Sequence, residues 1–239
     1  MSKSFFIDTT LCTACRGCQV ACKQWHDLPA EETTNRGTYQ NPADLSFDTY
    51  KLVRMSETVI GGQLRWLFFP EQCRHCIEAP CLETAGDPTA IYYDEPTGAV
   101  LYTSETRNLN AGEIKSSCPY NIPRNGPEGV LAKCDMCYDR VQAGMEPACV
   151  KTCPTGTMNF GNRQEMLDLA HKRLAVLKRT HPEAMLLDPD DIRVIFMVAY
   201  DHRLYHDFAV ASNTNHGISR QVALKRMLRP LRHLASHLL

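Results

Sequence analysis

The fold of this chain is decided by residues 12–22, which read CTACRGCQVAC and place four cysteines in an unbroken C-x2-C-x2-C-x3-C run. The first three thiolates of such a run bind three irons of one [4Fe–4S] cluster, and the fourth thiolate points to a neighbouring cluster. The first cluster is then completed by a distant cysteine that precedes a proline. The run therefore predicts a chain that handles electrons and folds around metal clusters.

The number of cysteines predicts the number of clusters. All 12 cysteines lie between residues 12 and 153, and four per cubane make three clusters with none left over. Cys153 precedes Pro154, so it completes the first cluster, and Cys22 passes to the second. The predicted ligand sets are Cys12, Cys15, Cys18 and Cys153 for the first cluster site, Cys22, Cys134, Cys137 and Cys149 for the second, and Cys73, Cys76, Cys81 and Cys118 for the third.

Other cysteine chemistries fit the spacing less well. Neighbouring cysteines in the first run are too crowded for independent disulfide bridges. The pair Cys134-x2-Cys137 resembles a zinc knuckle by itself, but the first run does not fit tetrahedral zinc. No cysteine pair is followed by histidine, as attachment of haem c would require. A Rieske centre needs two histidines, and the all-cysteine count closes without His75, which is therefore predicted to be non-ligating.

The middle of the chain predicts a second ferredoxin-like unit with one cluster site lost. Residues 90–93 and 99–102 flank the turn DEPTG and read as a β-hairpin, as in a two-cluster ferredoxin. A further cluster would need cysteines at four positions that are occupied by Ala85, Asn108, Ala111 and Ile114. All four ligands of one cluster are absent together, which indicates a vacant site.

The cluster pairing also predicts the domain organisation. Residues 1–30 and 131–162 form one ferredoxin-like unit with two clusters, and short strands at 5–7 and 158–160 pair at its rim. Residues 64–130 form the second unit, inserted in the first, and residues 31–63 form a surface linker. The predicted fold class is α+β, with two bacterial-ferredoxin-like units and a C-terminal helix and strand extension over 163–239.

The C-terminal extension carries no cluster chemistry. Asn162 is a helix N-cap with Glu165 at the third helical position, and an apolar stripe follows at helical spacing. Residues 193–200 read as a buried strand. The basic segment 216–239 suits a docking or membrane-surface helix, or a solvated terminus.

Composition excludes several other classes of function. No run of 18 apolar residues is present, so we expect no membrane-spanning helix, and the N-terminus shows no export signal. The formal net charge of −1 gives no long-range attraction to nucleic acid. Each oxidised cubane with its four thiolates adds a charge of about −2. Basic residues beside the ligands would stabilise the reduced clusters; they are Arg16, Lys23, Arg74, Lys133, Arg140 and Lys151.

Five segments carry a resemblance to a known family: 12–25 (CTACRGCQVACKQW), 68–76 (FFPEQCRHC), 118–124 (CPYNIPR), 133–137 (KCDMC) and 149–156 (CVKTCPTG). They resemble the iron–sulfur subunits of molybdopterin oxidoreductases, above all the small (beta) subunits of the soluble tungsten or molybdenum formate dehydrogenases of sulfate-reducing bacteria. The resemblance covers nearly the whole chain up to about residue 211. Membrane-bound relatives carry four clusters and usually a C-terminal spanning helix, and this chain departs on both counts.

The resemblance implies a non-catalytic electron-transfer subunit with three [4Fe–4S] clusters. It implies a heterodimer with a catalytic subunit that interconverts formate and carbon dioxide, and a multihaem cytochrome c as the external redox partner. Export in the folded state with the catalytic subunit would place the complex in the periplasm, with the cytoplasm as the alternative. Two other functions stay open: the electron-transfer subunit of a polysulfide, thiosulfate or sulfoxide reductase, and a free-standing polyferredoxin.

Overall fold

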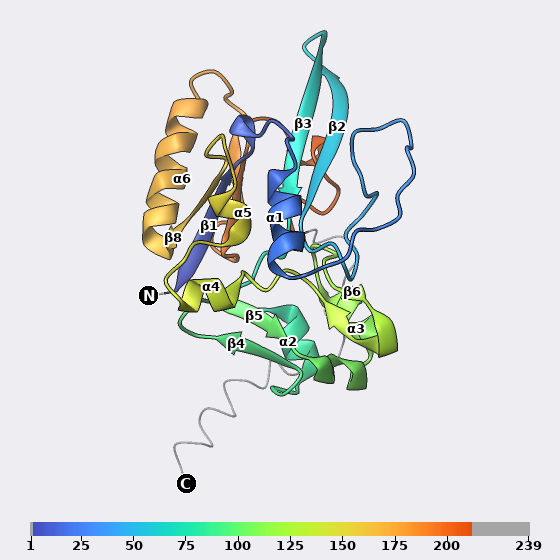
Figure 1. Ribbon diagram of the computed structural model, residues 1–239. Coiled ribbons are helices and arrows are strands. Elements are labelled where there is room, and N and C mark those ends of the chain that lie inside the picture. Colours follow the sequence, from blue (N-terminus) through green and yellow to red (C-terminus); the bar gives the residue numbers. More distant parts are fainter. Residues whose placement is uncertain (1, 212–239) are drawn as a thin grey trace.

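The computed structural model describes residues 2–211, in which helices and strands are mixed along the chain, as the α+β prediction requires (Figure 1). No helix within these residues is both long enough and apolar enough to span a bilayer. The elements are β1 (Lys3–Asp8), α1 (Gly17–Trp25), β2 (Leu52–Ile60), β3 (Gln63–Glu71), α2 (Pro80–Ala85), β4 (Ile91–Asp94), β5 (Ala99–Tyr102), α3 (Ala111–Ser117), β6 (Arg124–Asn125), β7 (Leu131–Ala132), α4 (Tyr138–Gln142), α5 (Ala148–Lys151), β8 (Met158–Asn162), α6 (Arg163–Leu177), β9 (Met185–Leu187) and β10 (Val194–Val198).

The main sheet has four strands in the order β8-β1-β10-β9. Strand β1 runs antiparallel to β8, which confirms the predicted pairing, and parallel to β10. Successive side chains of a strand point to opposite faces. Phe6 therefore packs among residues of α6, while Phe5 and Ile7 face the core on the other side. Helix α6 covers one face of the sheet, so the opposite face is left for the cysteine-bearing loops (Figure 1).

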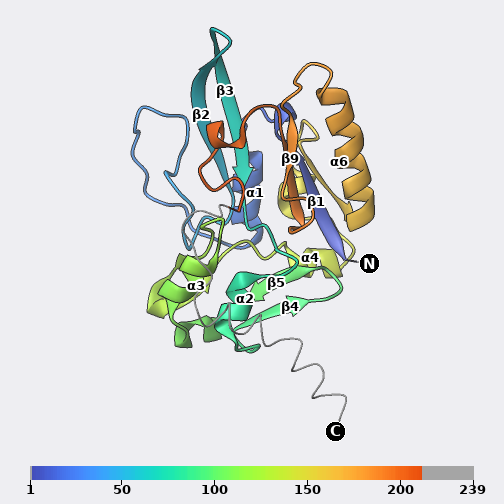
Figure 2. The same ribbon diagram turned by 180° about the vertical axis from the view of Figure 1, so that it is seen from behind.

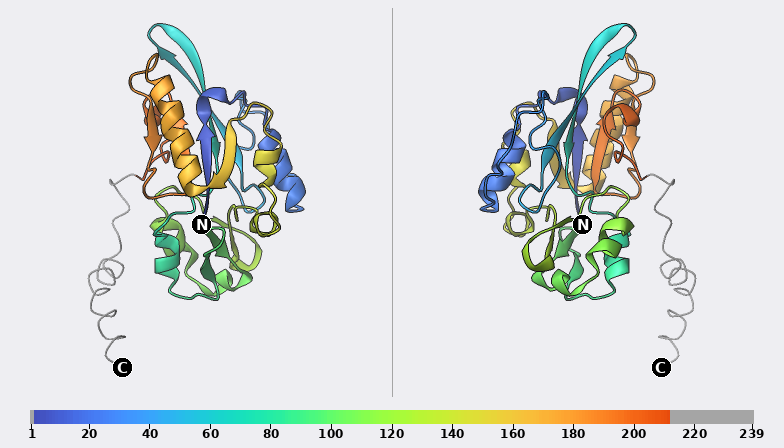
Figure 3. Two further views of the ribbon diagram at one scale, coloured as in Figure 1. Left: turned by 90° about the vertical axis from the view of Figure 1, so that its left-hand side faces the viewer. Right: turned by 90° about the vertical axis from the view of Figure 1, so that its right-hand side faces the viewer.

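A long β-hairpin packs against that opposite face. Strands β2 and β3 pair along their whole length, and Phe69 of β3 stacks on Phe196 of β10 with ring centroids 4.3 Å apart. The tip of the hairpin projects beyond the sheet (Figure 3). The structure therefore corrects two predicted boundaries. Residues 52–60 are not part of a surface linker, and residues 64–71 belong to this hairpin rather than to an inserted unit, because their apolar side chains complete the main core.

Residues 72–132 form the lower part of the molecule, with the β4–β5 hairpin beside α2 and α3 (Figure 2). The predicted hairpin is confirmed, and Gly98, with a φ of 80°, closes its turn in a conformation that favours glycine. Backbone hydrogen bonds join the lower part to the rest. Among them, the amide of Arg193 donates to the carbonyl of Arg74 at 3.1 Å, and the amide of Ile77 donates to the carbonyl of Asp191 at 2.8 Å.

The C-terminal part is integral to the main sheet. The predicted N-cap of α6 is confirmed, since Asn162 and Glu165 form a capping box. The predicted strand at 193–200 is confirmed as β10, which is buried along its whole length. Because β10 lies between β1 and β9, residues 163–200 complete the core rather than extend it, which corrects the prediction of an extension. The basic segment 216–239 lies outside the described residues.

Candidate iron–sulfur cluster sites

The first cysteine run forms a tight loop that leads into α1. Ala14 and Arg16 have φ angles of 52° and 59°, and this left-handed backbone curls the loop tightly. Helix α1 then carries Cys18 and Cys22, and α5 packs beside it. The packing of these two helices places the last cysteine group of the chain next to the first.

The structure brings the cysteines of the first predicted set into one pocket. Cys12, Cys15, Cys18 and Cys153 line it together with Val53, Pro70, Thr155 and Met158, among others. Cys15 is exposed, so this pocket reaches the protein surface. Burial raises the pKa of the Cys153 thiol, but hydrogen bonds from the backbone of Met158 and Thr155 outweigh burial, and its pKa is lowered. These donors favour the thiolate, which is the form that binds iron.

The four cysteines of the second predicted set are all buried and close to one another. Burial raises the pKa of the Cys22 thiol, and the neighbouring Cys149 and Cys137 raise it further. Burial also raises the pKa of Cys137 to about 12, with Cys149 as the next cause. Burial is also the largest cause that raises the pKa of the Cys134 thiol, and the neighbouring Cys22 and Cys137 raise it as well. Four buried thiols that repel one another when ionised need a positive charge among them to become thiolates.

The third predicted set lines a separate pocket in the lower part. Cys73, Cys76, Cys81 and Cys118 surround it together with Arg74, Tyr102, Tyr120 and Lys133, among others. Burial raises the pKa of Cys118 to about 12, with Cys81 as the next cause. Burial likewise raises the pKa of Cys81, which Lys133 and then Tyr102 oppose. This pocket therefore combines four thiols with cationic and hydroxyl groups.

The residues present fit [4Fe–4S] clusters. Each group holds four free cysteines, the number that one cubane needs. Beside the third group, the Arg74 side chain is fully buried, and its Nε and Nη2 have no hydrogen-bond partner among residues 2–211. A buried cation with unused donors suits a negatively charged group in the pocket that it lines.

The second group lies between the other two. Burial raises the pKa of the Cys149 thiol most, and Lys51 opposes this rise. Cys18 of the first group raises the pKa further. The pKa of Cys134 is raised by burial first and then by Asp135 and Cys22. Cys73 of the third group raises it further. These electrostatic contacts join the three groups into one series.

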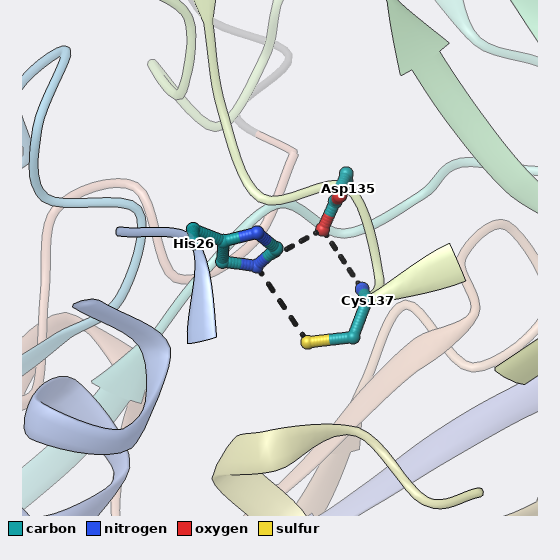
Figure 4. A group of neighbouring side chains, drawn as sticks. All are labelled: His26, Asp135 and Cys137. Carbon is teal, nitrogen blue, oxygen red and sulfur yellow. Dashed lines mark hydrogen bonds and ion pairs between the residues drawn. The ribbon is translucent and has the colours of Figure 1, made fainter. Parts of the chain in front are cut away.

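His26, Asp135 and Cys137 converge at the end of α1 (Figure 4). The Nε2 atom of His26 lies 3.6 Å from Sγ of Cys137 and 3.3 Å from Oδ1 of Asp135. Three such ligand atoms could hold a separate metal ion, but the sulfur of Cys137 is shared with the second cysteine group. The arrangement is better suited to a histidine that interacts with the sulfur of a cluster ligand.

The four positions of the predicted vacant site differ in their surroundings. Ala85, Ala111 and Ile114 belong to an apolar cluster with Leu82 and Leu109, and α2 packs against α3 there. The remaining position, Asn108, is exposed. Apolar packing thus occupies three of these four positions.

Two residues near the sites, His26 and Lys51, were not predicted from the sequence. His26 follows Cys22 by one helical turn, so helical spacing could have indicated it. Lys51 lies far from any cysteine in the sequence and becomes a neighbour only through the position of β2. His75, which was predicted to be non-ligating, accepts a hydrogen bond at its Nδ1 from the amide of Val100.

Comparisons with known proteins agree with the assignment of these sites to iron–sulfur clusters. Residues 64–163 match the 4Fe-4S dicluster domain family. The chain is 57% identical over 215 residues to the formate dehydrogenase subunit beta of Megalodesulfovibrio gigas, which covers 88% of this chain and 100% of the relative. It is 52% identical over 216 residues to the formate dehydrogenase 2 subunit beta (cytochrome c-553) of Nitratidesulfovibrio vulgaris, which covers 87% of this chain and 99% of the relative.

A more distant relative is the iron–sulfur subunit of the nitrate-inducible formate dehydrogenase of Escherichia coli. It is 41% identical over 207 residues, which is 84% of this chain and 70% of the relative. The first two matches span essentially the whole of each relative at more than half identity. The chain therefore belongs to the family of iron–sulfur (beta) subunits of formate dehydrogenases.

Proposed function

We propose that this chain relays electrons singly, through three [4Fe–4S] clusters, between the tungsten or molybdenum pterin subunit of a formate dehydrogenase and an external cytochrome c. The observation that carries the proposal is the grouping of twelve cysteines into three sets of four that follow one another through the protein. When bound, each cluster stores one electron. The cysteines hold the clusters, and the buried side chains around them exclude water from the second and third sites.

The proposed ligands are the three sets given by the cysteine spacing. Cys12, Cys15, Cys18 and Cys153 would hold the first cluster, and Cys22, Cys134, Cys137 and Cys149 the second. Cys73, Cys76, Cys81 and Cys118 would hold the third. The nested arrangement of two ferredoxin-like units is part of this proposal, with the inserted unit beginning after β3. The pairing of β1 with β8 and the apolar cluster at the vacant positions support it.

Copurification tests this function directly. The chain, isolated under anaerobic conditions from its native host, should be accompanied by a larger pterin-containing subunit, and the complex should reduce a viologen dye with formate. Polysulfide, thiosulfate or sulfoxide as the substrate instead of formate would assign the chain to another molybdopterin oxidoreductase. A brown protein that elutes alone would indicate a free-standing polyferredoxin.

The exposed end of the first site is the face that we propose for the catalytic partner. Cys15 is exposed there, and the neighbouring Arg16 donates from Nη1 to the carbonyl of Tyr39 at 3.2 Å. The Tyr39 ring lies 5.6 Å from that of Trp66, and the two residues are 60% and 50% exposed. Large exposed aromatic residues beside a redox site are typical of a surface that a partner covers.

Replacing Trp66 with glutamate should weaken the complex with the catalytic subunit. A buried charge at an aromatic contact would raise the dissociation constant about tenfold or more, or roughly 1.4 kcal/mol. Sedimentation of the purified subunits at several concentrations measures the dissociation constant. Val176→Glu is the matched control, because Val176 is 51% exposed on α6, on the other side of the main sheet. Equal weakening by both variants would contradict this docking face.

The proposed acceptor is a multihaem cytochrome c, and the proposed location is the periplasm. The name of the Nitratidesulfovibrio relative includes cytochrome c-553, which supports a cytochrome as the acceptor. Clusters must be inserted before export, so the complex would cross the membrane folded. Cell fractionation tests the location, since finding the chain in the cytoplasm beside an exported partner would contradict it.

A further inference from the structure

Lys51 is a buried lysine without an acidic partner among residues 2–211. The residue is 2% exposed, and it lies immediately before β2. Its Nζ donates to the carbonyl of Pro70 at 2.8 Å and to Oε1 of Gln72 at 2.6 Å, both of which are neutral acceptors. None of the ion pairs found within residues 2–211 includes Lys51. Burial of an ammonium group costs several kcal/mol unless a negative charge compensates it.

Lys51 acts electrostatically on cysteines of two groups at once. Burial raises the pKa of Cys12 and Cys18 in the first group, and Lys51 opposes the rise at both. Burial raises the pKa of Cys22 and Cys149 in the second group, and Lys51 again opposes it. Geometry agrees, because Pro70, whose carbonyl accepts from Nζ, lines the pocket of the first group. Leu52, the next residue along the chain, packs in one apolar cluster with Cys134 of the second group. Lys51 therefore lies between the two sites.

We propose that Lys51 is the counter-charge shared by the first and second clusters, and that it raises the reduction potential of both. The inference rests on the proposed function, since both sites must hold clusters. Each oxidised cluster carries a charge of about −2, and an added electron makes it more negative. A fixed cation in a site of low dielectric constant stabilises the reduced form more than the oxidised form. One lysine at this position thus favours the reduced state of two neighbouring carriers.

Lys133 provides a matched comparison at the other end of the series. It is 7% exposed, and its Nζ donates to the carbonyls of Val100 and Cys134. Lys133 lines the pocket of the third group, and it opposes the burial-driven rise in the pKa of Cys81. Lys133 is buried, as Lys51 is, but it acts on different cysteines. Loss of its charge should therefore act on the third cluster and leave the first unchanged.

Redox titrations of the assembled complex, monitored by electron paramagnetic resonance, test the proposal. In Lys51→Met, the ratio of reduced to oxidised first and second clusters at a fixed potential should fall about tenfold, or about 59 mV for a one-electron couple. Lys51→Arg keeps the charge and should remain near the wild-type values. Lys133→Met should leave the first cluster unchanged. Titration of the Lys51 variants in a Cys118→Ser background separates the signals of the first two clusters from that of the third.

The alternative outcomes are distinct. Unchanged potentials in Lys51→Met, a shift of only one cluster, or an equal shift in Lys51→Arg would overturn the shared counter-charge. If Lys51→Met fails to retain its iron, Lys51→Gln, which keeps a donor toward Pro70, is titrated in its place. Loss of both clusters from both neutral variants but not from Lys51→Arg would support the need for the charge. Iron analysis of the wild-type complex is a separate check, and a lack of clusters there would refute the proposed function instead.

Discussion

Replacing Cys118 with serine should remove about four irons from the complex and leave the first and second clusters in place. Cys118 lines the same pocket as Cys73, Cys76 and Cys81, although 37 residues separate it from Cys81 in the sequence. Serine offers a hard, protonated hydroxyl in place of a soft thiolate, so the cubane loses its fourth ligand. Iron and sulfide analysis, together with spectra of the reduced protein, measures the loss.

The ligand sets make this test selective. Cys76→Ser should give the same loss as Cys118→Ser, because both residues belong to the third set. Ser116→Ala is the control, since Ser116 is exposed on α3 and only bonds the carbonyl of Glu113. A Cys118 variant that lost the cluster held by Cys134 and Cys137 would contradict the proposed ligand sets.

Local sequence patterns predicted local structure well. The strands around Phe5 and Phe160, the β4–β5 hairpin and the capping box of α6 each depend on residues close together in the chain. The cysteine groups were predicted for a similar reason, because cluster geometry imposes a fixed spacing on neighbouring ligands. Where a cofactor or a turn requires certain residues at a fixed spacing, that spacing can be recognised in the sequence.

Long-range packing was not predictable in the same way. Strand β2 was expected in a surface linker, and in the structure its start, at Leu52 and Val53, is buried in the core. The place of β10 beside β1 follows from a parallel pairing between segments almost 190 residues apart. Lys51 reaches the cluster sites only through these two arrangements. Its charge could be read from the sequence, but the four cysteines that it faces could not.

Replacing Cys81 with serine should slow electron delivery to the cytochrome about a hundredfold or more, equivalent to roughly 2.7 kcal/mol in the effective barrier. The second cysteine group lies between the first and the third, and the first group reaches the surface proposed for the catalytic partner. Loss of the third cluster would then interrupt the route only at its outer end. Formate should still reduce the first and second clusters in this variant at the wild-type rate.

Cys15→Ser gives the opposite pattern and fixes the direction of transfer. Cys15 belongs to the first set, so its loss should prevent formate from reducing the second and third clusters as well as the cytochrome. Rapid-freeze spectroscopy after mixing with formate follows each cluster, and stopped-flow absorbance follows the cytochrome. If Cys81→Ser also abolished reduction of the first and second clusters in an assembled complex, the third site would lie next to the catalytic subunit. The route through the chain would then run in the reverse order, with the exposed Cys15 site as the exit.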